Sequence, residues 1–102
     1  MSLPELTGHQ RTHLRGLGQT MDPVIKLGKE GLTAAFLKEF ERCFSDKDLI
    51  KLRFLGADRH ERAALCDQLS QKASCLCVGA VGHTALFFKP HANPAKSSLV
   101  EG

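Results

Sequence analysis

Segments with helical periodicity alternate with short segments of strand periodicity along most of this chain. The helical segments follow Thr7, Thr33 and Asp58, whose side chains can cap the first turn of a helix. Strand-like segments lie between and after them, at 24–27, 49–55, 75–81 and 84–89. The order α-β-α-β-α-β-β predicts an α/β two-layer sandwich. We expect a mixed four-stranded sheet with the second and third helices on one face.

The length and composition indicate one folded domain. The 102 residues are 42% apolar and 25% charged, which is typical of a single globular domain, and we place it at 1–90. From Pro90 onward the chain has two prolines and little apolar content, so we expect 91–102 to be a flexible tail. No secretory signal and no apolar run of about 20 residues is present, which predicts a cytoplasmic protein without membrane contact. We expect it to be a monomer in isolation.

The side chains that could bind a metal or act as nucleophile or base do not indicate an enzyme. Four cysteines without an export signal are expected to be reduced thiols, and Cys75-x-Cys77 has no second pair to complete a zinc site. His9 and His13 have helical spacing but no third ligand, and no serine or cysteine is placed to form a nucleophile–base pair. We therefore predict no catalysis, no metal and no small-molecule cofactor.

The sequence Gly28-Lys29-Glu30-Gly31 separates a strand from a helix, and three interpretations compete for it. A nucleotide-phosphate cradle is disfavoured, because a P-loop needs four residues between its glycines and a following Lys-Ser/Thr. A plain turn remains open. In the third interpretation the loop receives the backbone of a nucleic acid, since glycines permit close approach and the helix N-terminus attracts anions.

Basic residues near this loop favour the nucleic-acid interpretation. The formal net charge is +3, which allows an anionic partner without requiring one. We expect Arg11 and Arg15 on one face of the first helix, and Lys26, Lys51 and Arg53 on the uncovered face of the sheet. Alternation can add Phe87 and Lys89 to that face, as in single-strand binding surfaces, although we favour a core position for Phe87.

The ordered set of motifs resembles the CRM domain family, and most closely its stand-alone, YhbY-like bacterial members. The resemblance runs from about Leu6 to Pro90. It is carried by "LTGHQRTHLRGLGQTMDPVIKLGKEGLT", by "DLIKLRF" and by the closing "VGHTALFFKP".

This resemblance implies a fold similar to the carboxy-terminal domain of a translation initiation factor. It also implies RNA binding at Gly28, Lys29, Glu30 and Gly31, without catalysis. The implied partner is large-subunit ribosomal RNA or a precursor particle, with a role in ribosome assembly. The alternative is a protein-interaction module that binds a ribosomal protein or an assembly factor.

Overall fold

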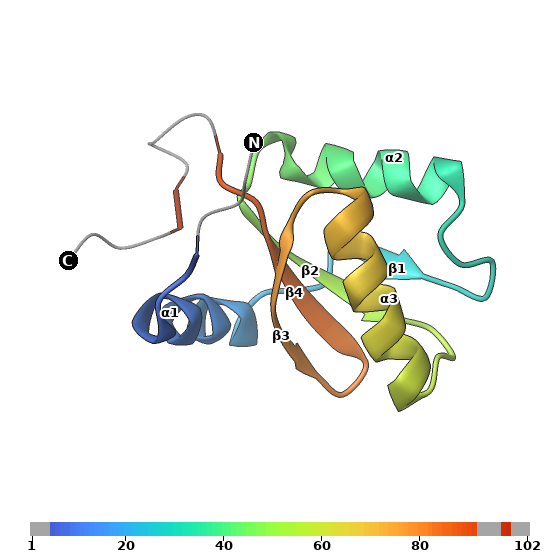
Figure 1. Cartoon of the computed structure of the whole chain (residues 1–102), viewed down its shortest axis with the longest axis horizontal. Coiled ribbons are helices and arrows are strands. Elements are labelled where there is room, and N and C mark those ends of the chain that lie inside the picture. Colours follow the sequence, from blue (N-terminus) through green and yellow to red (C-terminus); the bar gives the residue numbers. More distant parts are fainter. Residues whose placement is uncertain (1–4, 92–96, 99–102) are drawn as a thin grey trace.

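The computed structural model describes residues 5–91 and 97–98 (Figure 1). Its helices are α1 (Gly8–Gln19), α2 (Ala34–Arg42) and α3 (Arg59–Lys72), and the 3-10 turn η1 (Cys43–Ser45) follows α2 directly. Its strands are β1 (Ile25–Leu27), β2 (Leu49–Phe54), β3 (Leu76–Val81) and β4 (Thr84–Phe88). The expected order of elements is confirmed, and each strand is one residue shorter than predicted.

The four strands form one mixed sheet in the order β1-β2-β4-β3. β1 and β2 are parallel, with α2 as the crossover between them, whereas β4 is antiparallel to both β2 and β3. The register of the β3–β4 pair shifts between Cys77 and Gly79. The predicted mixed four-stranded sheet is therefore confirmed.

Local capping explains where the helices begin. The Thr7 and Asp58 side chains each accept a hydrogen bond from the backbone of the residue three positions on, and that residue's side chain accepts one in return. Thr33 caps α2, because its Oγ1 accepts from the backbone N–H of Phe36 at 3.0 Å. Each satisfied N–H would otherwise lack a partner inside the helix.

The larger core lies between the sheet and the layer formed by α2 and α3. Phe40 of α2 is fully buried, and its ring meets that of Phe87 on β4 edge to face, with 5.2 Å between centroids. Leu69 of α3 is also fully buried in this cluster. Aromatic burial of this kind is the main stabilising contribution of a small core.

Helix α1 lies against the opposite face of the sheet (Figure 1). Its Leu14 is fully buried with apolar residues of three strands, and Gly18 contacts Leu86 so closely that a Cβ there would overlap the leucine side chain. We expected this face to be uncovered, and that is wrong for the part beneath α1. The cluster consists of Leu14, Leu49, Val78, Leu86 and Phe88.

Ser98, beyond the last strand, lies against the folded domain. Its backbone N–H donates to the carboxylate of buried Asp48 at 2.6 Å, and its hydroxyl bonds the same carboxylate. Of the expected flexible tail, 92–96 and 99–102 lie outside the described residues, so that expectation stays a prediction. Within the described ranges, no helix is long and apolar enough to cross a membrane.

Candidate functional site

Three connections converge at one end of the sheet. They are the β1–α2 loop at residues 28–31, which we call the GxxG loop, the β2–α3 loop at 55–57 and the β3–β4 turn at 82–83 (Figure 1). The Leu55 N–H donates to Leu27 O at 2.8 Å and the Phe54 N–H donates to His83 O at 2.7 Å. These bonds hold the three connections together, so side chains far apart in the sequence share one surface.

The two glycines of the GxxG loop differ in what the fold requires of them. Gly31 has φ +74° and its N–H donates to Gly28 O at 3.2 Å, so a turn explains this glycine. Gly28 has no positive φ, and a Cβ built on it would meet nothing within 4 Å. The fold therefore gives no reason for glycine at position 28, and the space beside it is open to a ligand.

Lys29 extends the loop surface toward the neighbouring connection. Its Cε lies 3.9 Å from where a Cβ on Gly56 would stand. Both Lys29 and Glu30 are exposed, and the Lys29 ammonium has no hydrogen bond or ion pair with any residue in the described ranges. The cation is available to an external anion.

The N-terminus of α2 follows the loop and adds backbone donors. The first turn of this helix contains no acidic residue, and Thr33 satisfies only the N–H of Phe36. Unpaired N–H groups of a first turn carry partial positive charge. The GxxG loop thus contains a lysine and leads into a helix end that carries partial positive charge.

A row of side chains crosses the sheet beside this loop. Lys26 is paired with Arg53, Arg53 with Thr84, and Thr84 with Val81, so the four positions lie side by side on successive strands. Lys26 and Arg53 are exposed and have no side-chain partner within the described part of the chain. We call these four residues the transverse row. It lies on the α1 face of the sheet, because the flanking residues Leu27, Leu52 and Phe54 belong to the opposite core.

Lys51 does not take the exposed position that the sequence predicted. It is half-buried beneath α1, and its Nζ donates to Gly18 O at 3.0 Å and Met21 O at 3.2 Å. These carbonyls lie at the end of α1, where a cation is favourable. The lysine holds the helix end on the sheet, so its expected place as a free surface cation is corrected.

The two arginines of α1 lie away from the GxxG loop. The Arg15 Nε donates to Val78 O on β3 at 2.9 Å, and its aliphatic stem packs over Gly79. Arg11 is half-buried one turn earlier. The structure thus places Lys26, Lys29 and Arg53 together at one end of the sheet, and Arg11 and Arg15 beside β3.

Phe87 and Lys89 lie on the face opposite to the transverse row. Phe87 is fully buried against α2, so the favoured interpretation of a core residue is confirmed and the stacking interpretation is wrong. The Lys89 Nζ donates to Ala73 O at 3.1 Å and stands 5.9 Å from the Phe44 ring centroid. The register pairs Phe87 with Ile50, not with Lys51, and this pairing decides the face.

The sequence reasoning missed Arg62 and His83. One guanidinium nitrogen of Arg62 donates to Ala57 O at 2.7 Å and lies 3.4 Å from His83 Nδ1, which links α3 to the β3–β4 turn. The capping box at Asp58 was a usable signal, because it places Arg62 in the first turn of α3. The two carboxylates near Arg62, Asp58 and Glu61, accept hydrogen bonds from backbone N–H groups in the capping box, and the hydrogen bond from the Glu61 N–H lowers the pKa of Asp58.

The family model of the CRS1/YhbY (CRM) domain matches residues 6–89. This chain belongs to the CRM domain family. The resemblance drawn from the sequence is thereby confirmed, and the matched region spans all of the helices and strands described above.

Relatives of this CRM domain are named as RNA-binding proteins. One from Pseudomonas aeruginosa, named a probable RNA-binding protein, is 33% identical over 92 residues, which cover 90% of this chain and 88% of that protein. One from Haemophilus influenzae, named an RNA-binding protein, is 31% identical over 85 residues, covering 83% of this chain and 86% of that protein. A solution structure of a Staphylococcus aureus protein has the same fold, with TM-score 0.78 and 24% identity over 88% of this chain and 94% of that one.

The chemistry that this CRM domain offers is recognition of anions. Within residues 5–91 and 97–98, no group of three or more histidine, cysteine or acidic side chains is placed to hold a metal ion. The surface around the GxxG loop instead carries exposed cations, open glycine backbone and the N-terminal donors of α2. These groups fit the phosphates of a nucleic acid.

Proposed function

We propose that this protein binds RNA through the GxxG loop and the adjoining basic end of the sheet. The observation that carries the proposal is Gly28, a glycine that neither a positive φ nor a close neighbour requires, next to the exposed cation of Lys29. A glycine lets a sugar-phosphate backbone approach the protein main chain closely, because it has no Cβ. The names of the two bacterial relatives and the family membership support the same partner.

In this mechanism the loop positions the RNA backbone and carries no base specificity. Phosphates lie against Gly28 and Gly31, with Lys29 on one side and the first turn of α2 on the other. Lys26 and Arg53 bind further phosphates along the strand. Glu30 weakens the loop's attraction for phosphate, which makes affinity more dependent on the neighbouring cations.

The proposed partner is large-subunit ribosomal RNA or a precursor particle, and the proposed role is in ribosome assembly. This follows from the resemblance to stand-alone bacterial CRM domains. We further propose that the protein acts in the cytoplasm, as a monomer, and by binding alone without catalysis. The four cysteines are free thiols, which supports a reducing compartment.

The test is binding to large-subunit ribosomal RNA fragments across about 50 to 200 mM salt. The variant Gly28→Asp with Lys29→Glu replaces the only cation of the neutral loop and makes the loop negative, without touching the positive φ of Gly31. Its matched control is Gln71→Asp with Lys72→Glu, which changes the net charge equally at the far end of α3, where both residues are exposed. Circular dichroism verifies that both variants fold.

We expect wild-type affinity to fall steeply with salt, and the loop variant to lose about tenfold or more at fixed salt, while the control binds nearly as wild type. Equal binding by all three proteins would show that the loop is only a turn. Failure of the wild type to bind any fragment would favour the alternative, a module that binds a ribosomal protein or assembly factor.

A further inference from the structure

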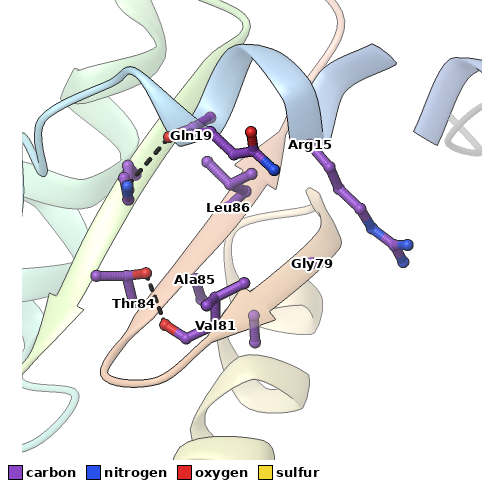
Figure 2. Close-up of a pocket in the computed structure, with 10 residues that line it drawn as sticks. Arg15, Gln19, Gly79, Val81, Thr84, Ala85 and Leu86 are labelled. Carbon is purple, nitrogen blue, oxygen red and sulfur yellow. Dashed lines mark hydrogen bonds between the residues drawn. The ribbon is translucent and has the colours of Figure 1, made fainter. Parts of the chain in front are cut away.

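A cavity of about 560 Å³ opens between the end of α1 and the β3–β4 hairpin (Figure 2). Gln19 of α1 lies on one side, Val81 and Thr84 of the hairpin lie on the other, and Leu86 lies at the back. Arg15 stands at the edge beside Gly79. Its volume falls within the ~300–1,000 Å³ typical of sites for small organic groups.

Small residues and a strand irregularity create this space. Gly18 lets α1 approach β4, so the helix ends directly over the sheet, and Gly79 follows the register shift of β3. The Arg15 stem covers Gly79 of the hairpin, but Val81, nearer the hairpin turn, is left 81% exposed. The cavity therefore has an exposed apolar surface at Val81, which we call the apolar shelf.

The polar groups around the cavity suit a nucleotide. Among the described residues that line it, Arg15 and Lys51 are charged and none is acidic, and the Lys51 ammonium is already bonded to Gly18 O and Met21 O. The Gln19 side chain is exposed at the mouth and offers both an amide donor and an acceptor. Surfaces that bind single-stranded nucleic acid combine a positively charged groove with side chains on which bases stack, usually aromatic ones. Here Arg15 supplies charge at the rim, and the exposed aliphatic side chain of Val81 offers the contact surface.

The cavity is continuous with the RNA-binding surface proposed above. Its residues Thr84 and Val81 are the last two members of the transverse row, whose first two are Lys26 and Arg53. Four neighbouring strands span about 14 Å, three spacings of ~4.8 Å. A short single strand leaving the GxxG loop along this row reaches the cavity.

We propose that the cavity receives one unpaired base of the same RNA strand that the GxxG loop holds by its backbone. The base lies on Val81 and Leu86, the Gln19 amide bonds its edge, and Arg53 and Arg15 contact the flanking phosphates. This inference rests on the proposed function and deepens it, because it requires single-stranded RNA and adds a contact to a base. None of the described residues that line the cavity is aromatic, so the contribution of the base is modest.

The test separates base contacts from phosphate contacts. The probes are a fluorescein-labelled single-stranded RNA of mixed sequence, about 12 nucleotides long, within the ~4–16 nucleotides that small single-strand modules cover, and an abasic ribose-phosphate strand of the same length. Val81→Ser removes the apolar shelf without changing the charge. Val24→Ser is the matched control, since Val24 is an exposed valine, 48% accessible, beside the opposite edge of the sheet.

We expect wild type to prefer the base-bearing strand, and Val81→Ser to lose about threefold to tenfold of that affinity while binding the abasic strand as before. The salt slope should stay the same, because no phosphate contact is lost. Val24→Ser should behave as wild type. With 4-thiouridine in the base-bearing strand, ultraviolet cross-links should map to the peptides that contain Gln19 or Val81.

Two results would overturn the inference. In the first, wild type binds both strands and the loop variant (Gly28→Asp with Lys29→Glu) binds neither, but Val81→Ser prefers the base-bearing strand as strongly as wild type does. The cavity then takes no base, and the loop proposal stands. If wild type binds neither these strands nor ribosomal RNA fragments, the proposed function and the cavity proposal both fall.

Discussion

Lys26 and Arg53 stand directly opposite each other on the parallel strands β1 and β2, and neither cation has a partner within the described ranges. Like charges in opposed strand positions destabilise a sheet. A fold that keeps such a pair without a counterion does so at the expense of its own stability. Phosphate groups are a counterion that relieves the repulsion.

Replacing both cations with alanine should weaken RNA binding and leave the fold intact. Each lost phosphate contact lowers the magnitude of the salt slope by about 1, so the double variant should lose about 2. The melting temperature should stay equal or rise, because the like-charge pair is gone. Titrations at several salt concentrations and a thermal melt measure both quantities, and Lys72→Ala is the control. An unchanged slope would remove these residues from the interface.

Gly18 and Gly16 should respond oppositely to alanine. A methyl group at Gly18 overlaps the Leu86 side chain, whereas one at Gly16 meets nothing within 4 Å. Overpacking should make Gly18→Ala less stable by about 1–3 kcal/mol, and Gly16→Ala should be more stable by about 0.5–1 kcal/mol. Urea unfolding of the two variants gives both values. Stabilisation of both would mean that α1 does not dock through Gly18.

The two glycines of the GxxG loop should separate stability from binding. Gly31→Ala forces a side chain into φ +74°, which costs about 1–2 kcal/mol of folding free energy. Gly28→Ala meets no such strain and should keep its stability, but the added methyl group stands where the RNA backbone approaches. Unfolding and RNA titrations on both variants test this. Gly28→Ala binding as wild type would show that nothing comes close to that residue.

Cys77 should be the most reactive thiol of the protein near neutral pH. A hydrogen bond from the Cys66 thiol lowers the pKa of Cys77 to about 7, while burial raises the pKa of Cys75 to about 12. Iodoacetamide should therefore modify Cys77 first, with a rate that rises through about pH 7. Cys66→Ala should slow it at pH 7 by raising the pKa of Cys77. Mass spectrometry of the labelled peptides shows which cysteine reacts, and faster labelling of Cys75 would contradict the assignment.

The lowered pKa also predicts the pH dependence of stability. The same hydrogen bond raises the pKa of Cys66, which costs stability as the pH rises through the ordinary thiol value of 9.0. Cys77, whose pKa is lowered to about 7, acts in the opposite direction and stabilises the fold above pH 9.0. This contribution falls away as the pH drops through 7. Ionisation of Cys77 should therefore add to the free energy of unfolding at pH 9 relative to pH 6. Replacing Cys77 with serine should remove this contribution.

Local sequence rules located most of the fold. The capping boxes at Thr7 and Asp58 depend only on residues three positions apart, and the alternation of 49–55 depends only on its neighbours, so both are readable without tertiary information. The family motifs likewise pointed to the GxxG loop before the geometry was known.

Placement of the sheet faces was not readable in the same way. The range 84–89 is apolar on both sides, so alternation separates Leu86 from Phe87 without saying which one meets α2. Lys51 looked like an exposed cation because nothing local shows that α1 ends above it. The face that Leu86 occupies and the burial of Lys51 both depend on the contact between Gly18 and Leu86. These two residues lie 68 positions apart, so local sequence patterns do not reveal the contact.

The two edge strands of this sheet, β1 and β3, disfavour pairing with a strand of another chain for different reasons. β1 is three residues long and presents Lys26, and a short charged edge is a poor template for a further strand. β3 is twice as long and carries no charge, but its regular ladder is broken between Cys77 and Gly79, and Arg15 already occupies the carbonyl of Val78. The irregularity that opens the cavity thus also keeps an uncharged edge from seeding aggregation.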